Sequence, residues 1–165
     1  MLFRSLQIRN SHLSKKRSRT GDLLARFDQR LPFELTAGQK KVWSEIDSDL
    51  TSEHPMYRLL QGDVGSGKTI IALRAMLAMI DSGAQSALLA PTEVLAQQHL
   101  RNFQNLLGDL GEAGMLGGAA NGTRVEILTG SQTSQERDRA LSAIRNGEAG
   151  IVVGTHALLS DGVEF

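Results

Sequence analysis

Residues Gly62 to Thr69 constrain the fold of this 165-residue chain more than any other stretch. They read GDVGSGKT and match the phosphate-loop pattern G-x-x-x-x-G-K-[ST] at every fixed position. Such a loop works between a buried strand and a helix, and the sequence predicts both. Residues 56–60 form a short apolar run, and the residues after the loop place apolar side chains on one helical face. This context disfavours the alternative, a glycine-rich turn that binds nothing.

The residue types of this loop suit the binding of a nucleoside triphosphate. Glycines permit positive φ and let the backbone approach phosphates closely, so that successive N–H groups point at the anion. The helix that follows adds its positive dipole end. Lys68 supplies a charge for the β- and γ-phosphates and Thr69 a hydroxyl for Mg²⁺, and these two are the predicted catalytic residues. The predicted phosphate site comprises Gly62, Asp63, Val64, Gly65, Ser66, Gly67, Lys68 and Thr69.

Composition places the chain among ordinary globular proteins with one domain. Apolar residues make up 41% and charged residues 22%, and no apolar stretch is long enough to cross a bilayer. The absence of cysteine excludes disulfides and thiolate metal sites and is consistent with a reducing interior such as the cytoplasm. The four histidines lack the spacing of a zinc site.

Charge is distributed unevenly along the chain. The first nineteen residues hold six of the 18 basic side chains and no acid, which leaves 12 basic and 18 acidic residues in the remainder. We interpret residues 1–20 as a basic, poorly ordered linker. A nucleic-acid-binding arm and a cleaved organelle-targeting segment are the alternatives for this stretch.

Hydrophobic periodicity predicts helices alternating with strands. Residues 108–122 contain six glycines and are expected to form a surface loop with one small apolar turn. Capping and stop signals set the expected ends of the elements. We expect helices over 21–30, from the N-cap Thr36 to about Leu50, from the phosphate loop to Gly83, over 93–107, and from the N-cap Thr133 to Gly147, with strands over 56–60, 85–90, 124–128 and 149–153.

This alternation indicates an α/β fold, a parallel sheet with helices on both faces. Right-handed crossovers then bring every strand-to-helix turn to the carboxyl edge of the sheet. The turns at 90–93, 128–131 and 154–156 should therefore line one rim beside the nucleotide.

Gln39 lies about two dozen residues before the phosphate loop, in the setting LPFELTAGQ. Its amide offers both a donor and an acceptor, which match the exocyclic amine and N7 of adenine. Phe33 is placed to lie against the base or the ribose. Together with the loop they predict ATP as the nucleotide, although a glutamine of this kind is by itself more often an ordinary surface residue.

Four motifs carry a resemblance to a known family. They are Gln39 in LPFELTAGQ, GDVGSGKT, APTEVLAQQH at 90–99 and GTHALL at 154–159, and their order and spacing resemble superfamily 2 helicases. They are most similar to the RecG family of bacterial ATP-dependent helicases, which remodel branched DNA and stalled forks. The translocase module of the transcription-repair coupling factor Mfd is the alternative, and Ser66, Glu93 and Ala157 favour RecG.

The resemblance implies a P-loop NTPase of the RecA-like type and assigns roles to individual residues. Gln39, with Phe33, would recognise adenine, and the loop would hold ATP and Mg²⁺. The three rim turns would contact a DNA backbone without reading its sequence. Those implied DNA contacts are Pro91, Thr92, Glu93, Thr129, Gly130, Gly154, Thr155 and His156. From the residues alone, Pro91 and Thr92 fit a plain helix start, and His156 equally fits a core histidine.

The resemblance also implies that residues 21–165 are an incomplete RecA-like domain. The family places its acidic DE-x-x motif on the strand after the equivalent of Phe165, and its second RecA-like domain and wedge domain lie elsewhere in the polypeptide. We therefore expect a monomeric, cytoplasmic bacterial motor whose partners are branched DNA and the rest of its own chain, with no membrane. The 165 residues alone should bind ATP weakly, turn over almost none, and leave a sheet edge open.

Two other classes remain as competing interpretations. A GTPase or small-molecule kinase could use the same loop, but the chain has no Asn-Lys-x-Asp guanine motif and no identifiable lid. A non-catalytic module could bind nucleic acid or a partner through the basic segment at residues 1–19.

Overall fold

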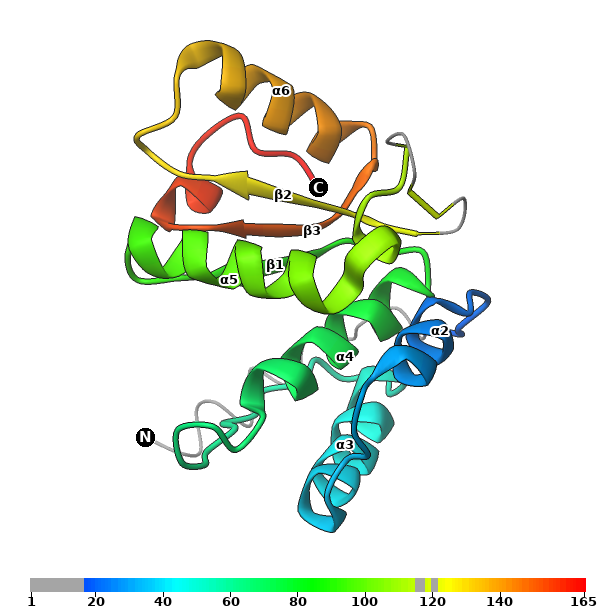
Figure 1. Cartoon of the computed structure of the whole chain (residues 1–165). Helices are drawn as coiled ribbons and strands as arrows, with labels where there is room; N and C mark the ends of the chain where they lie inside the picture. Colours follow the sequence, from blue (N-terminus) through cyan, green and yellow to red (C-terminus); the bar gives the residue numbers. More distant parts are fainter. Residues whose placement is uncertain (1–16, 115–117, 120–121) are drawn as a thin grey trace.

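The computed structural model describes residues 17–114, 118–119 and 122–165 (Figure 1). Most of the expected basic linker, residues 1–16, lies outside this range. The elements in chain order are α2 (Leu23–Arg30), α3 (Ala37–Leu50), α4 (Lys68–Ile80), β1 (Ser86–Leu89), α5 (Glu93–Leu107), the 3₁₀ turn η1 (Gly108–Gly111), β2 (Arg124–Leu128), α6 (Ser134–Arg145), β3 (Ala149–Gly154) and the 3₁₀ turn η2 (His156–Leu159).

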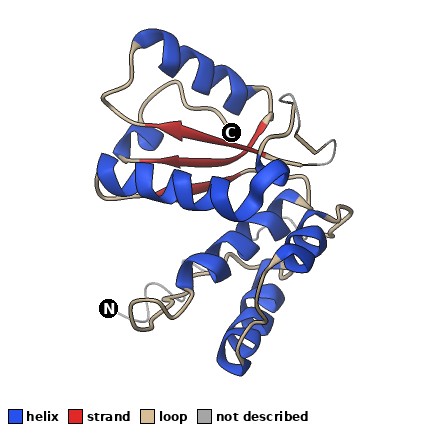
Figure 2. Ribbon diagram, viewed as in Figure 1, coloured by secondary structure: helices blue, strands red, loops and turns tan. Residues whose placement is uncertain are grey.

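The sheet of the described residues has three strands in the order β1-β3-β2, and both pairings are parallel (Figure 2). Every residue of the central strand β3 is buried, as its apolar sequence AGIVVG predicts. The register aligns Leu89 of β1 and Leu128 of β2 with Gly154 of β3, so the three strands end at one level. The predicted α/β class and parallel sheet are confirmed.

Helices cover both faces of the sheet, and each face has its own core. Helices α4 and α5 lie on one face, with α2 packed on α4, while α6 covers the other (Figure 1). Alternate residues of β3 belong to the two cores. Ile151 and Val153 lie in the core that contains Phe103 of α5, whereas Val152 lies in the core that contains Ile144 of α6. The predicted arrangement of helices is therefore also confirmed.

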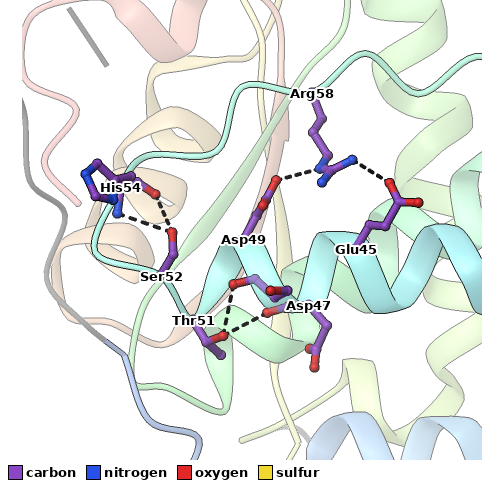
Figure 3. Close-up of polar contacts among 8 residues, drawn as sticks. Glu45, Asp47, Asp49, Thr51, Ser52, His54 and Arg58 are labelled. Atoms are coloured by element: carbon purple, nitrogen blue, oxygen red, sulfur yellow. Dashed lines mark hydrogen bonds and ion pairs between the residues drawn. The ribbon is translucent and has the colours of Figure 1, made fainter. Parts of the chain in front are cut away.

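The predicted strand at residues 56–60 is wrong. No strand is formed there, and Tyr57 and Leu59 are largely exposed. Arg58 instead donates hydrogen bonds to Asp49 and Glu45 of α3, which holds the segment against that helix (Figure 3). A short apolar run makes a strand only beside another strand, and no strand pairs with 56–60 among the described residues.

An apolar pocket of about 340 Å³ lies beside this segment. Its lining comes from the segment itself, from α3 and α4, and from Ser86 and Ala87 of β1. Strand β1 pairs only with β3 in the described sheet, so its other edge has no partner strand among the described residues.

Local signals fix most helix ends. Thr133 and Glu136 form the predicted capping box of α6, and Gly83 and Gly147 have positive φ just after their helices. The small apolar turn expected within residues 108–122 is η1, but its Leu110 is fully buried in the core rather than part of a surface loop. Of the helices in the described residues, none combines the length and apolar character that a membrane crossing requires.

Candidate nucleotide site and nucleic-acid rim

The phosphate loop leads directly into α4, as the motif requires. Gly65 and Gly67 have φ of 82° and 85°, values that side chains with a Cβ rarely adopt. At Gly62 a Cβ would lie 2.7 Å from the Ser66 hydroxyl oxygen, so a larger residue there would displace the Ser66 side chain. Most of the loop is exposed, and Val64 is fully so. The backbone therefore forms an open cradle at a helix N-terminus.

Lys68 occupies the first position of α4 and points back over the loop. Its ammonium group donates to the carbonyl oxygens of Gly62 at 2.6 Å and Asp63 at 2.8 Å. These are neutral partners, so the positive charge is not paired with a carboxylate. Thr69 follows in the first turn of the helix. A free ammonium charge above a glycine cradle fits a polyphosphate, and a hydroxyl beside it fits Mg²⁺.

Gln39 is bound to this loop across 27 residues of sequence. Its side-chain N–H donates to the carbonyl oxygen of Ser66 at 2.9 Å, and its amide oxygen accepts the backbone N–H of Thr36 at 2.9 Å. The second bond completes a capping box at the start of α3, in which the Thr36 hydroxyl accepts the Gln39 N–H. This use of Gln39 was not predicted, although Thr36-x-x-Gln39 is itself a capping pattern.

A pocket of about 270 Å³ lies between the start of α3 and the loop. Gln39, Gly62, Ser66 and Lys68 all line it, so four predicted nucleotide-binding residues meet at one cavity. Phe33 is 47% exposed and does not line this pocket. The pocket and cradle together suit a nucleotide whose base lies toward α3 and whose phosphates lie at α4.

The three rim turns lie together at the carboxyl ends of the strands, on the same side of the view as the start of α4 (Figure 1). Backbone bonds join them: the N–H of Ala90 donates to Gly154 and that of Thr155 to Leu128. The predicted contact residues divide by exposure. Those that face solvent are Pro91, Thr92, Gly130 and His156, whereas Thr129, Gly154 and Thr155 are buried and Glu93 is half-buried.

Glu93 connects two of these turns. Its carboxylate accepts the backbone N–H of Ser131 at 3.0 Å and also the Ser131 hydroxyl. Hydrogen bonds from Ser131 and from the backbone of Gly130, together with the nearby charge of His156, hold the pKa of Glu93 below its usual value. Ser131 was not predicted, because no local signal marks a contact between residues 38 apart.

The acidic and histidine side chains of the described residues are the candidates for a metal centre. In residues 17–114, 118–119 and 122–165, no cluster of three or more histidine or acidic side chains is suited to hold a metal ion.

Comparison with known proteins agrees with this geometry. The sequence pattern of the DEAD/DEAH box helicase family matches residues 36–164. The ATP-dependent DNA helicase RecG of Mycobacterium tuberculosis is 54% identical over 89% of this chain and 20% of its own length. RecG of Streptococcus pneumoniae is 47% identical over 82% of this chain and 18% of its own length. The chain thus spans about a fifth of the length of the curated relatives it matches.

Solved structures show the same likeness. A structure described as RecG bound to a three-way DNA junction superposes with a TM-score of 0.84 at 38% identity, over 98% of this chain and 21% of that one. A hypothetical ATP-dependent RNA helicase from Sulfolobus tokodaii, at 18% identity and a TM-score of 0.57 over 87% of this chain and 38% of that one, shares the fold. With its family pattern spanning the phosphate loop and all three rim turns, the chain belongs to the DEAD/DEAH box helicase family.

Proposed function

We propose that this chain is the ATP-binding part of a DNA helicase that remodels branched DNA and stalled replication forks. The observation that carries the proposal is the glycine cradle at the start of α4, with Lys68 above it and Gln39 bound to it. Similarity to RecG proteins, one of them in a structure with a three-way DNA junction, supports DNA rather than RNA as the nucleic acid.

The nucleotide would be held by residues from two elements. The loop N–H groups and Lys68 would bind the phosphates of ATP, and Thr69 would bind Mg²⁺. Gln39 would exchange its bond to Ser66 for contacts with adenine, and Phe33, exposed in the segment before α3, would cover the base. Bound ATP would supply the free energy that drives DNA remodelling.

DNA would bind along the rim. Pro91, Thr92, Gly130 and His156 are exposed there and would face the sugar–phosphate backbone. The buried Thr129, Gly154 and Thr155 would act through the shape that they give the turns, since Gly154 leaves no room for a Cβ beside the Leu128 carbonyl. Contacts of this kind position a strand without reading its bases.

Efficient turnover would require further groups. Hydrolysis needs several charges placed around the developing transition state, and the loop contributes one cationic side chain, Lys68, with the hydroxyls of Ser66 and Thr69. We therefore expect weak ATP binding and negligible hydrolysis by these residues alone, and a monomeric cytoplasmic motor when the wedge and second RecA-like domains of the family are joined to them.

Titration of the chain with fluorescent ATP and Mg²⁺ tests the nucleotide site. Lys68→Ala should abolish the signal, while Lys41→Ala, at an exposed position on α3, should leave it unchanged. If the two variants bind ATP equally well, the phosphate-loop assignment fails.

A chimaera tests the activity of the whole motor. This chain would replace the matching fifth of the M. tuberculosis relative, and unwinding of a three-way junction would be measured. The chimaera should unwind the junction with ATP, and the Lys68→Ala chimaera should not. A folded chimaera that hydrolyses ATP without acting on branched DNA would contradict the DNA-remodelling function.

A further inference from the structure

The side chain of Glu93 is directed at the protein rather than at solvent. One carboxylate oxygen accepts the Ser131 N–H at 3.0 Å and the other accepts the Ser131 hydroxyl. Gly130 lies beside the same carboxylate, since a Cβ at this position would be 3.5 Å from a Glu93 oxygen. Glu93 begins α5, whereas Gly130 and Ser131 follow β2, so one side chain joins two turns that are far apart in sequence.

The second turn has a separate internal support. The Gln132 side chain accepts the Thr129 N–H at 3.0 Å and donates to the Ile127 carbonyl at 3.1 Å. These bonds fix the start of the turn relative to its own strand. Gly130 and Ser131 form the exposed tip of this turn and are not fixed by the Gln132 bonds. Their contact with the neighbouring turn is through Glu93.

A carboxylate on a surface that binds DNA requires an explanation, because it repels phosphate groups. Both oxygens of the Glu93 carboxylate accept hydrogen bonds from the protein. The same bonds lower the pKa of Glu93, so the carboxylate remains ionised and hydrogen-bonded near neutral pH. Its position half-buried between the turns is consistent with an internal role.

We propose that Glu93 is a positioning residue that holds the Gly130–Ser131 tip at a fixed place beside the start of α5, so that both turns present one continuous surface to a DNA backbone. This inference rests on the proposed DNA-binding function. It assigns to Glu93 an effect on DNA affinity through Ser131, with no contact between its carboxylate and DNA.

DNA binding by the full chain tests this role, with a labelled fork as the probe. Glu93→Ala should weaken binding about tenfold, because charge-assisted hydrogen bonds that order the tip are lost. Glu93→Gln should recover most of the affinity, since its amide can accept from the Ser131 N–H and donate to the Ser131 oxygen. Glu53→Ala, the same charge change at an exposed position beyond α3, serves as the matched control.

Two further comparisons separate positioning from general damage. The affinity for fluorescent ATP should not change in Glu93→Ala, because the phosphate loop does not contact this residue. The double variant Glu93→Ala/Ser131→Ala should bind DNA no more weakly than Glu93→Ala alone, since the two residues act as one unit.

Opposite results would overturn the proposal. Tighter DNA binding by Glu93→Ala and Glu93→Gln would show that the carboxylate repels DNA or occupies amides that phosphate would use. Equal weakening by both variants would show that charge, not the bonds to Ser131, is what matters. Additive losses in the double variant would show that Glu93 acts independently of Ser131.

Amide exchange measured by NMR tests the same contact without DNA. The Gly130 and Ser131 amides should exchange faster in Glu93→Ala and near the wild-type rate in Glu93→Gln. Absence of any change in Glu93→Ala would refute the positioning role. If the unaltered chain fails to bind the fork while these rates change as expected, the proposed DNA function fails and the Glu93 contact stands.

Discussion

Residues 17–82 and residues 83–165 share one apolar core, to which the first region contributes Phe27, Leu73 and Leu77, but they differ in the contacts added around it. In the first region, charged side chains join the helices: Arg74 pairs with Asp28 and lies over the Trp43 ring at 4.4 Å, and Arg58 bridges to α3. In the second region, the central strand and the inner faces of α5 and α6 are buried among apolar side chains.

The two candidate sites fall on opposite sides of this division. The phosphate loop and Gln39 lie in the first region, whereas the three rim turns are extensions of the sheet in the second. Residues 62–66 of the phosphate loop are exposed, whereas Thr129, Gly154 and Thr155 of the rim are buried. Because burial restrains a segment more than solvent exposure does, we expect the nucleotide site to rearrange more readily than the rim.

The largest expected effect is that of Phe103→Ala in the sheet region. Phe103 is fully buried on α5, so its removal leaves a cavity and should lower the free energy of unfolding by about 3–5 kcal/mol. Phe33→Ala, where the ring is 47% exposed, should cost about 0.5 kcal/mol. Urea unfolding followed by circular dichroism measures both free energies of unfolding. Equal losses of stability in the two variants would show that burial of the ring does not decide its contribution.

Arg74→Met tests the charged links of the helical region. The side chain of Arg74 is 7% exposed and that of Asp28 is 36% exposed, so the pair is only partly desolvated. Losing the pair and the contact with Trp43 should cost about 2–3 kcal/mol, the methionine retaining the aliphatic packing. Arg139→Met on the exposed side of α6 is the control for urea unfolding. A cost no greater than that of the control would show that apolar contacts alone stabilise this region.

Asp81→Asn addresses the link between α4 and α2. The buried Asp81 carboxylate accepts the backbone N–H groups of Leu23 at 2.9 Å and Leu24 at 3.0 Å and thereby caps α2 from a distance. Asparagine offers one acceptor oxygen, which leaves a buried N–H unpaired at a cost of about 1–2 kcal/mol. Thermal unfolding should show this loss, with exposed Asp161→Asn as control. An unchanged midpoint would mean that α2 needs no cap.

The smallest expected effect is the pH dependence of stability that Glu136, in the second region, contributes. Hydrogen bonds from the Thr133 backbone and hydroxyl lower the pKa of Glu136 from 4.5, as those from Ser131 lower that of Glu93. A lowered folded-state pKa means that the stabilisation is complete above about 4.5 and is lost as pH falls through the folded value. The unfolding temperature should therefore drop below that pH.

Glu136→Gln isolates this contribution. The variant should lose part of the difference between unfolding temperatures measured at about pH 6 and about pH 3.5, because it has no carboxylate to protonate. Glu53→Gln, the same change at an exposed position beyond α3, is the matched control. A variant whose melting temperature falls with pH as steeply as wild type would contradict a role for Glu136.

Much of the fold could be predicted because its determinants are local. The phosphate-loop glycines, the caps Thr36 and Thr133 and the stop residues Gly83 and Gly147 act within a few residues of themselves. The apolar sequence of β3 likewise predicts a strand buried on both faces. The candidate nucleotide residues Gln39 and Lys68 were identified for the same reason, since fixed spacing defines their motifs.

What the sequence could not decide depends on partners that are distant along the chain. The run at 56–60 has the composition of a strand but lies against α3. Arg58 forms ion pairs with Glu45 and Asp49 there, and no strand of the described sheet pairs with residues 56–60. Three other contacts likewise join residues that are 27 to 58 positions apart. They are the hydrogen bonds of Gln39 with Ser66, of Asp81 with the start of α2, and of Glu93 with Ser131. Local sequence thus determined most of the helices and strands and the phosphate loop. The tertiary structure decided which polar groups form hydrogen bonds and ion pairs, because these depend on interatomic distances that only the folded chain sets.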